Sequence, residues 1–463
     1  MAPRTETDGS ASDQDVRSRS TPGFVAEDLP GPDWLRSRRA AALARSGHLP
    51  LPTGEAEEWR YSRIAELDVS RFAAAPAVSP GAVPESVRST LSGLGPTSGV
   101  VVAVDGRVVD VRFDADRCAG DGAGAGGGSD GGSGSALGVR FGSALDDANR
   151  AEGLLGRAAE HPTDLFAAWN DALTAEPVVL DVPAGVVLEH PFVVVNHAAC
   201  GSVATFPRLV VRLGVGATAS VIEIHSSDDV GALVVPVTEL VVGEGAGLRH
   251  AVLQDMGPSV WQIASLAATV DAKATLDVGA AALGGDYARL RMDCHLTGRG
   301  ATGNLSSVYL GDRDQMLDLR TFQVHEAPDT TSNLLFKGGV AGTSHSVYTG
   351  LIRIAPGARG SNAFQTNRNL KLSDGAWAES VPNLEIQNND VHCSHASTVG
   401  PVDSDQRFYL ESRGVPTSVA ERLVVGGFFD EVLDDFAVPA VVDVVRDRLD
   451  ATLDLALGRA ATS

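Results

Sequence analysis

The fold is decided by residues 214–278, which read GVGATASVIEIHSSDDVGALVVPVTELVVGEGAGLRHAVLQDMGPSVWQIASLAATVDAKATLDV. Short Val-rich runs alternate here with turns, and the pairs Gly216-Ala217, Gly245-Ala246 and Lys273-Ala274 each follow one apolar run and open the next. Similar pairs at Gly300-Ala301 and Gly357-Ala358 give successive gaps of 29, 28, 27 and 57 residues, the last being two units. This fixed period, without helices between the strands, predicts the stacked coils of a β-helix. A β-sandwich also fits the strand spacing, but it gives no reason for a fixed period.

The chain divides into segments of different character. The expected fold class is mainly β, with a parallel β-helix core over residues 176–400. Helical regions flank this core, an N-terminal one over residues 31–175 and a C-terminal one over residues 401–463. Residues 1–30 are polar and expected to be disordered, and the Gly/Ser-rich insert at 119–136 is expected to be a flexible linker or loop.

Local signals within the N-terminal region predict individual elements. Residues 32–47 have the composition of a helix, with Pro near the start and Gly at the end. Residues 100–104 and 108–113 read as a strand pair around the Asp105-Gly106 turn. Helical patterning resumes over residues 144–173.

The C-terminal region reads as helices over residues 403–412 and 416–425, followed by a longer helical segment from 430 to about 459 that is interrupted at Pro439. Its apolar side chains fall at helical spacing and form one stripe: Val432, Leu433, Phe436, Val441, Val442, Val445, Leu449 and Leu453. The default expectation is that this stripe packs on the chain's own core. The alternative is that a partner protein covers this stripe.

Charge and hydropathy exclude several classes of partner. The formal charge is -22, from 59 acidic and 37 basic residues, and such a surface repels phosphate backbones and anionic lipids. We therefore expect neither a nucleic acid nor a membrane as partner. Residues 1–30 lack the apolar stretch of a secretory signal, and no apolar run approaches the roughly 18 residues that span a bilayer, which predicts a soluble, cytoplasmic protein.

The four cysteines are far apart in the sequence, at Cys118, Cys200, Cys294 and Cys393, so no CxxC pair exists to bind zinc or form a redox couple. Cys200 and Cys294 lie in apolar runs and are expected to be packed thiols rather than sulfur carriers. Any metal site must use ligands brought together by the fold or shared with another chain.

Common catalytic motifs are missing. No GxxxxGK[ST], GxSxG or HExxH is present, and the single GxGxxG, at Gly122, Gly124 and Gly127, lies inside the Gly/Ser insert rather than between a strand and a helix. We therefore expect no enzyme that uses ATP or a dinucleotide.

Small acidic groups keep one enzymatic alternative open. Asp228-Asp229 and the pair Asp312 and Asp314 lie in the β-rich core, where a β-helix carbohydrate-active enzyme uses paired carboxylates. Asp is also favoured in turns, because its side chain bonds its own backbone. With aromatic residues at 5%, few flat faces are available to stack on sugars.

One segment invites metal chemistry, Asp390-Val391-His392-Cys393-Ser394-His395. If it is a strand, Cys393 and His395 point to the same face, while His392 and Ser394 point to the other. Thiolate and imidazole suit iron or an iron-sulfur cluster, but two ligands cannot complete its coordination, so a second protein would supply the rest. The alternative is a buried Cys and a hydrogen-bonded His without a metal role.

The chain resembles the SufB/SufD family of iron-sulfur cluster assembly proteins, and the resemblance extends over most of the chain beyond residue 30. The segments that carry it are Glu57-Glu58-Trp59-Arg60-Tyr61-Ser62, residues 182–191 (VPAGVVLEHP), 369–374 (NLKLSD), 381–386 (VPNLEI), 390–395 (DVHCSH), 398–400 (TVG), 405–414 (DQRFYLESRG) and 420–432 (AERLVVGGFFDEV). Two features favour the SufD branch over the SufB branch. Ala376 stands where SufB-like sequences have a cysteine, and Cys393-Ser394-His395-Ala396 stands where they read EHEA.

The resemblance implies a β-helix flanked by helical ends and a non-catalytic scaffold role. SufB is the implied partner along the β-helix, and a transient iron-sulfur cluster shared with it is implied at the interface, with no stably bound cofactor. His395 is then the first candidate ligand to iron or the cluster, and Cys393 is the second.

The C-terminal helices are implied to dock the SufC ATPase, through Asp405, Phe408, Tyr409, Arg413, Phe428, Phe429, Val432 and Phe436. Sulfur is implied to arrive from the cysteine desulfurase SufS and its sulfur-transfer partner through SufB, and the family leaves room for a reduced flavin in the complex. A purely structural interaction protein is the third class kept open, beside the scaffold and the carbohydrate-active enzyme. Trp59 and Tyr61 are expected to anchor the helical region against the core.

Overall fold

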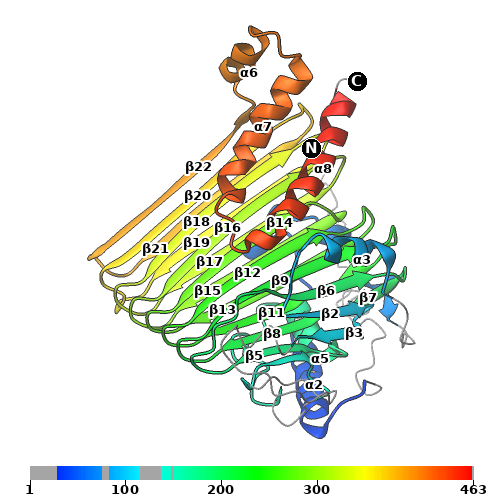
Figure 1. Ribbon diagram of the computed structural model, residues 1–463, viewed down its shortest axis with the longest axis vertical. Coiled ribbons are helices and arrows are strands. Elements are labelled where there is room, and N and C mark those ends of the chain that lie inside the picture. The colour runs from blue at the N-terminus through cyan, green and yellow to red at the C-terminus, as the bar shows by residue number, and fades with distance from the viewer. Residues whose placement is uncertain (1–28, 76–82, 115–136, 147–150, 461–463) are drawn as a thin grey trace, which may run out of the picture.

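The computed structural model describes residues 29–75, 83–114, 137–146 and 151–460. Its core is a parallel β-solenoid of about eight turns with helices at both ends of the sequence, which confirms the expected fold class (Figure 1). Cys118, the GxGxxG, the insert at 119–136 and nearly all of the expected disordered N-terminus lie outside the described residues.

Two sheets form the walls of the solenoid, because each coil gives one strand to each sheet. Sheet A has the order β21 (Trp377–Ile386), β19 (His345–Ile354), β17 (Met316–His325), β15 (Tyr287–Leu296), β13 (Trp261–Val270), β11 (Val237–Val242), β8 (Arg208–Leu213), β5 (Val178–Val182) and β4 (Arg140–Ser143), with the short strands β1 (Ala73–Ala74), β7 (Val203–Thr205) and β10 (Leu233–Val234) beside it.

Sheet B has the order β22 (Val391–Pro401), β20 (Ser361–Lys371), β18 (Thr331–Val340), β16 (Thr302–Gly311), β14 (Thr275–Ala282), β12 (Gly247–Asp255), β9 (Thr218–Ser227), β6 (Phe192–Ala198), β2 (Gly99–Val104) and β3 (Arg107–Phe113). Neighbouring strands are parallel except β2 with β3 and β4 with β5. Aliphatic side chains at alternate positions fill the space between the sheets. The parallel coils exclude the sandwich, and the predicted hairpin of β2 and β3 is confirmed.

One turn repeats in every coil and explains the period. Its first residue has a left-handed backbone, with φ between 57° and 73°, and its N–H donates to a carbonyl of the next coil, as from Gly216 to Glu244. The equivalent residues are Gly185, Gly216, Gly245, Lys273, Gly300, Asp329 and Gly360. Glycine suits this position because it adopts positive φ without strain. A small buried residue follows in most coils, for example Ala217 and Ala274.

The predicted repeat was wrong at its last member. Asp329-Thr330 and Gly360-Ser361 occupy the turn positions, whereas Gly357-Ala358 lies in a turn that is longer than in the preceding coils. Asp329 reaches the left-handed region at φ 59°, as Asp does more readily than most residues, so the unit between 300 and 360 has no Gly-Ala pair.

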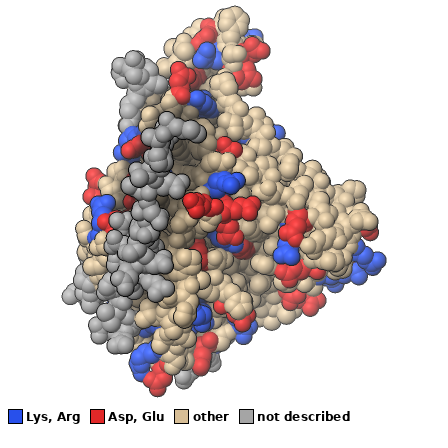
Figure 2. Space-filling model, turned by 180° about the vertical axis from the view of Figure 1, so that it is seen from behind, with Lys and Arg blue, Asp and Glu red and all other residues tan. Residues whose placement is uncertain are grey.

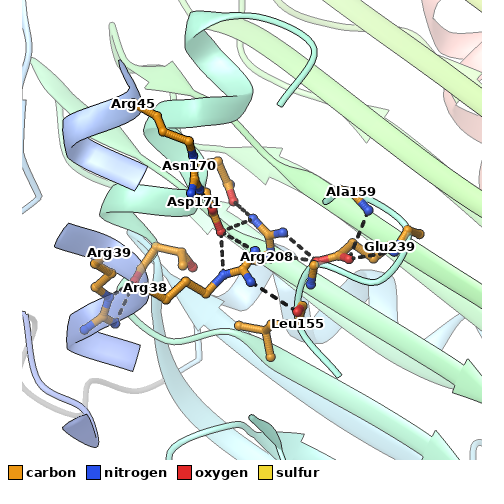
Figure 3. Close-up of polar contacts among 12 residues, drawn as sticks. Arg38, Arg39, Arg45, Leu155, Ala159, Asn170, Asp171, Arg208 and Glu239 are labelled. Carbon is orange, nitrogen blue, oxygen red and sulfur yellow. Dashed lines mark hydrogen bonds and ion pairs between the residues drawn. The ribbon is translucent and has the colours of Figure 1, made fainter. Parts of the chain in front are cut away.

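Helices α2 (Asp33–Ser46) and α5 (Leu165–Leu173) pack together over the outer face of sheet A, near its N-terminal strands (Figure 1). Asp171 of α5 accepts from Arg38 and Arg45 of α2 at 2.7 and 2.8 Å (Figure 3). Beneath them Arg208 and Glu239 form an ion pair at 2.5 Å inside the protein (Figure 3). Burial without such partners would be costly for each charge.

The remaining N-terminal elements are short: α3 (Glu85–Ser92) and the 3-10 helices Glu57–Trp59, Ile64–Glu66 and Val69–Arg71. Helix α2 confirms the helix expected at 32–47. The expected helical stretch at 144–173 was wrong over most of its described length. The structure has turns from 152 to 164, and helix α5 begins only where Asp164 caps it by accepting from the N–H of Ala167 at 2.9 Å.

Helices α7 (Thr417–Leu433) and α8 (Val442–Ala460) lie across the outer face of sheet B, and α6 (Ser404–Glu411) projects beyond it (Figure 1). A 3-10 turn, Pro439–Val441, joins α7 to α8. The apolar stripe packs on the chain's own sheet, as expected by default. The expected break after 425 was wrong, because burial of Val425, Phe429 and Val432 holds α7 helical through Gly426-Gly427.

Candidate functional site

The candidate site lies at the C-terminal end of the solenoid. Strands β21 and β22 are the last members of their sheets, so each has one edge that no described strand of this chain pairs. The sequence of β22, VHCSHASTVGP, has no Asp, Glu, Lys or Arg, and β21 has only Glu379 and Glu385. Figure 2 shows the largely uncharged surface along the sloping edge on the right of the view. Natural proteins usually protect exposed edges with charged side chains, and this end lacks most of that protection.

Cys393 and His395 lie on β22 and share the face that looks into the solenoid, as the strand period predicts. Cys393 is half-buried against Ala363 and Ile354 of the coil below, and this burial raises the pKa of its thiol. His395 is exposed, because no described residue stacks above it. The structure therefore brings both predicted ligands together on one face.

Apolar side chains complete this inner face. Leu384 and Ile386 of β21 and Val399 of β22 are 37%, 45% and 45% exposed. Their partners in the coil below, Ile352, Ile354 and Asn369, are fully or nearly fully buried. The last coil thus presents core-type residues that the next coil of a longer solenoid would cover.

Beneath this face lies a polar layer that sequence reasoning missed. Gln365, Asn367 and Asn369 of β20 point inward and are at most 2% exposed. The hydroxyl of Tyr309 donates to Asn369 at 2.6 Å and accepts from Asn367 at 2.9 Å. The signal that could have found this layer is the alternation of polar amides along QTNRN at 365–369.

Within the described ranges, no group of three or more His, Cys, Asp or Glu could hold a metal ion. Cys393 and His395 alone would therefore form only part of a ligand set. Cys294 is buried inside the solenoid, and burial raises the pKa of its thiol to about 12, so it fits the expected packed thiol. Cys200 is only half-buried.

The acidic groups of the carbohydrate alternative lie in turns. Asp228-Asp229 follow β9, and Asp312 and Asp314 lie between β16 and β17, which confirms their interpretation as turn residues. A buried carboxylate that sequence reasoning missed is Glu223, inside the solenoid. Burial alone would raise its pKa, but His225 and His250 outweigh that effect and hold the pKa well below its usual range.

The helical arm, defined as α6 with the first half of α7, carries exposed aromatic residues. Phe408 and Tyr409 of α6 are 69% and 55% exposed, and the guanidinium of Arg413 lies 4.4 Å over the Tyr409 ring. Asp405 is also exposed. No described residue of α6 is buried, and Asp405 and Tyr409 line a groove between α6 and the solenoid.

The other residues implied in ATPase docking lie elsewhere. Phe429, Val432 and Phe436 are at most 4% exposed and pack on sheet B, so they hold the helices to the solenoid rather than offering a contact surface. This corrects the expected contact region, because a helical stripe packed on its own chain is closed to a partner. Phe428 is half-buried and lies against Lys337.

Lys337 fixes α7 to the solenoid. It is 2% exposed, and its Nζ donates to the carbonyl of Phe428 at 2.7 Å and to the carboxylate of Glu431. A groove of about 900 Å³ opens beside it, between the arm and the strands β20 and β22. The second half of α7 is thus held to the solenoid by Lys337 and by the buried Phe429 and Val432, and the arm extends from it.

The N-terminal aromatic residues are structural in part. Trp59 is buried, and the guanidinium of Arg289 lies 3.8 Å over its ring on the outer face of sheet A, which confirms its expected anchoring role. Tyr61 is 47% exposed and contacts Trp377 at the start of β21, with ring centroids 5.9 Å apart. The segment therefore reaches from the N-terminal helices to the last coil.

Among the described residues, no helix has both the length and the apolar character needed to cross a bilayer.

Comparison with known proteins places these features in a family. The family model described as SUF system FeS cluster assembly, SufBD core domain, matches residues 194–428, about half of the chain, from β6 to α7. An iron-sulfur cluster assembly SufBD family protein of Mycobacterium tuberculosis is 38% identical over 224 residues, which are 47% of this chain and 55% of that protein. A SufBD family protein of Staphylococcus epidermidis is 23% identical over 286 residues, 61% of each chain. The match spans about half the length of the first of these relatives.

Proposed function

The chain belongs to the SufBD family of iron-sulfur cluster assembly proteins, and on that premise we propose that it is a SufD-type, non-catalytic scaffold subunit. In this role it binds a SufB-type solenoid at its last coil and a SufC-type ATPase through its helical arm. The transient cluster is cargo shared with the SufB-type subunit. A cytoplasmic location belongs to the same proposal.

The observation that carries the proposal is the open, nearly uncharged last coil with Cys393 and His395 on its inner face. An exposed edge strand without charges is a template for another strand. Stacking of a second solenoid there would bury Leu384, Ile386 and Val399, and it would convert an aggregation-prone end into an interface.

The two edges differ in their capacity to pair. Pro382 lies within β21 and has no N–H, so that strand lacks one donor. Strand β22 has no proline before its last residue, Pro401. We therefore assign the main strand pairing with the SufB-type subunit to β22, the strand that carries both candidate ligands.

His395 and Cys393 can supply one imidazole and one thiolate to iron or a growing cluster. The raised pKa of Cys393 makes its thiolate the less available ligand at neutral pH, which ranks His395 first. The remaining ligands come from the partner subunit. Sulfur enters through the SufB-type subunit from a SufS-type desulfurase with its transfer partner, and a reduced flavin has its place in the complex rather than in this chain.

The helical arm is the second contact in the proposal. Phe408 and Tyr409 offer exposed aromatic surface, the type of residue that dominates interface energies, and Asp405 and Arg413 lie near them. Because α7 is fixed to strand β18 through Lys337, motion of a bound ATPase would be transmitted to the solenoid two strands below β22. The chain alone is expected to turn over no ATP.

The test is coexpression with the SufB-type and SufC-type proteins of the same organism, followed by purification on a tag and size-exclusion chromatography. The variant Ile386→Lys/Val399→Lys puts two charges on the inner face of the last coil. It is expected to lose the SufB-type subunit and keep the ATPase. Phe408→Ala/Tyr409→Ala is expected to show the opposite pattern.

Val215→Lys is the matched control, because Val215 is 58% exposed on a turn of the solenoid far from both surfaces. It should assemble like the unaltered chain. Retention of the SufB-type subunit by the double lysine variant would refute the assignment of the interface. A chain that copurifies with neither partner and cleaves polysaccharide would return the function to the carbohydrate alternative.

A further inference from the structure

Gln365 lies directly beneath the candidate ligand His395. The two residues pair in the parallel register of β20 and β22, so their side chains share the inner face, one coil apart. Neighbouring strands are separated by about 4.8 Å, which is within reach of a hydrogen bond between an amide side chain and an imidazole. Register therefore places a polar side chain immediately below the ring.

The amide of Gln365 is buried and unsatisfied. The residue is 2% exposed, and neither its Nε2 nor its Oε1 has a hydrogen-bond partner. In the same strand Asn367 and Asn369 are bonded to each other and to Tyr309. Buried amides without partners are rare in native proteins and call for an explanation. In this strand the unsatisfied amide is the one below His395.

The opposite wall gives the amide its space. Gly350 of β19 faces Gln365, and a Cβ at Gly350 would lie 2.5 Å from the Gln365 Nε2 and 2.3 Å from the Tyr348 hydroxyl. Tyr348 itself pairs with Thr321 at 2.9 Å and does not satisfy the amide. The amide thus fills space that a side chain at 350 would need. Its unpaired Nε2 and Oε1 belong to the residue that lies directly below His395 in the strand register.

We propose that Gln365 is a positioning residue for His395. With the ring turned over the amide, the Gln365 carbonyl accepts the N–H of one ring nitrogen. That bond fixes the tautomer and leaves the lone pair of the other nitrogen toward the open end, where iron or a cluster is bound. Metal-binding histidines usually donate their second N–H to such a group. The inference rests on the proposed function only in treating His395 as a ligand.

The test is the tautomer of His395 in the full chain, measured by nitrogen-15 NMR with labelled histidine at pH 8 and assigned by the spectrum of His395→Ala. One tautomer is expected to dominate in the unaltered chain, and Gln365→Leu is expected to give the mixture typical of free imidazole. Gln323→Leu is the matched control, because Gln323 is also buried with an unsatisfied amide but lies below Ile352 and Leu384. It should leave the tautomer unchanged.

A second measurement is the affinity of the assembled complex for Fe(II) alone, which Gln365→Leu is expected to weaken by about 10 to 100-fold. Equal tautomer populations in the unaltered chain and in Gln365→Leu would overturn the positioning role, whatever the complex does. A complex that fails to assemble would refute the proposed function but leave the tautomer test intact. An equal effect of Gln323→Leu on the tautomer would also overturn the inference, since the effect would then come from loosened packing.

Discussion

The two ends of the solenoid are built differently. At the N-terminal end, antiparallel strands β3 and β4 finish the sheets, and Phe113, Phe141 and Phe192 fill the mouth of the first coil, with the rings of Phe141 and Phe192 4.7 Å apart. At the C-terminal end, parallel strands finish both sheets, and Ile386 and Val399 on the inner face stay 45% exposed.

The difference distinguishes the end that closes the chain's own fold from the end that is open to another protein. A solenoid needs atypical terminal coils to stay soluble, and the N-terminal end has them in its aromatic plug and reversed strands. The C-terminal end keeps the composition of an internal coil, and the candidate ligands lie there. The following predictions test this contrast in order of expected effect on stability.

The largest effect is expected at the plug. Phe141 is 1% exposed, and Phe141→Ala should lower the free energy of unfolding by about 4 kcal/mol through lost burial and a cavity. Ile386→Ala, at the open end, should lower it by less than about 1 kcal/mol, because this side chain is already half-solvated. Urea unfolding of both variants checks the contrast. Equal losses would show that the open end is packed in the isolated chain.

A pH effect on stability is expected at the buried imidazole of His325. His325 is buried at a coil corner, and its ring nitrogens contact the hydroxyls of Thr330 and Ser332 at 2.8 and 2.9 Å. Burial lowers its pKa to about 4. Since the folded pKa lies below the unfolded value of about 6.5, its contribution is complete above that value and is lost as pH falls toward 4.

The expected loss is about 3 kcal/mol across this window, because each pKa unit corresponds to about 1.4 kcal/mol. His325→Gln should flatten the stability profile between about pH 6.5 and 4 relative to the unaltered chain. The check is urea midpoints at a series of pH values. A slope that survives in His325→Gln would assign the effect to other groups.

A smaller effect is expected where the arm joins the solenoid. Lys337→Met keeps the packed stem but removes the bonds to the Phe428 carbonyl and Glu431, and should lower stability by about 2 kcal/mol. Arg368→Met is the control, since Arg368 is half-exposed and 3.8 Å from Glu431, and should lower it by less than about 1 kcal/mol. Amide hydrogen exchange in α7 should rise only in Lys337→Met. Unchanged exchange would show that the apolar contacts alone hold the helix.

The sequence was enough to predict the solenoid and to place Cys393 and His395 on one face, since both follow from periodicity, with period 2 along the strand and near 28 along the chain. It could not fix the register beyond residue 300, because Asp329-Thr330 replaces the Gly-Ala pair. Phe429 and Val432 look the same in sequence whether their own sheet or a partner covers them. The role of Gln365 could not be predicted from the sequence, because Gln365 and His395 are 30 residues apart in the chain and become neighbours only when the coils stack.

The smallest effect on stability is expected at His395, where the largest effect on function is expected. His395→Ala removes an exposed ring, so the urea midpoint should stay within about 0.5 kcal/mol of the unaltered chain and the complex should still assemble. Cluster build-up should nevertheless fail, because an imidazole ligand is lost from the shared site. Cys393→Ala should be milder, since its thiol is half-buried and its pKa is raised.

The measurement is complementation of a strain that lacks the protein, scored by iron-sulfur enzyme activity, with complex recovery and unfolding measured in parallel. If His395→Ala restores that activity as well as the unaltered chain does, the open end remains an interface but His395 is no ligand.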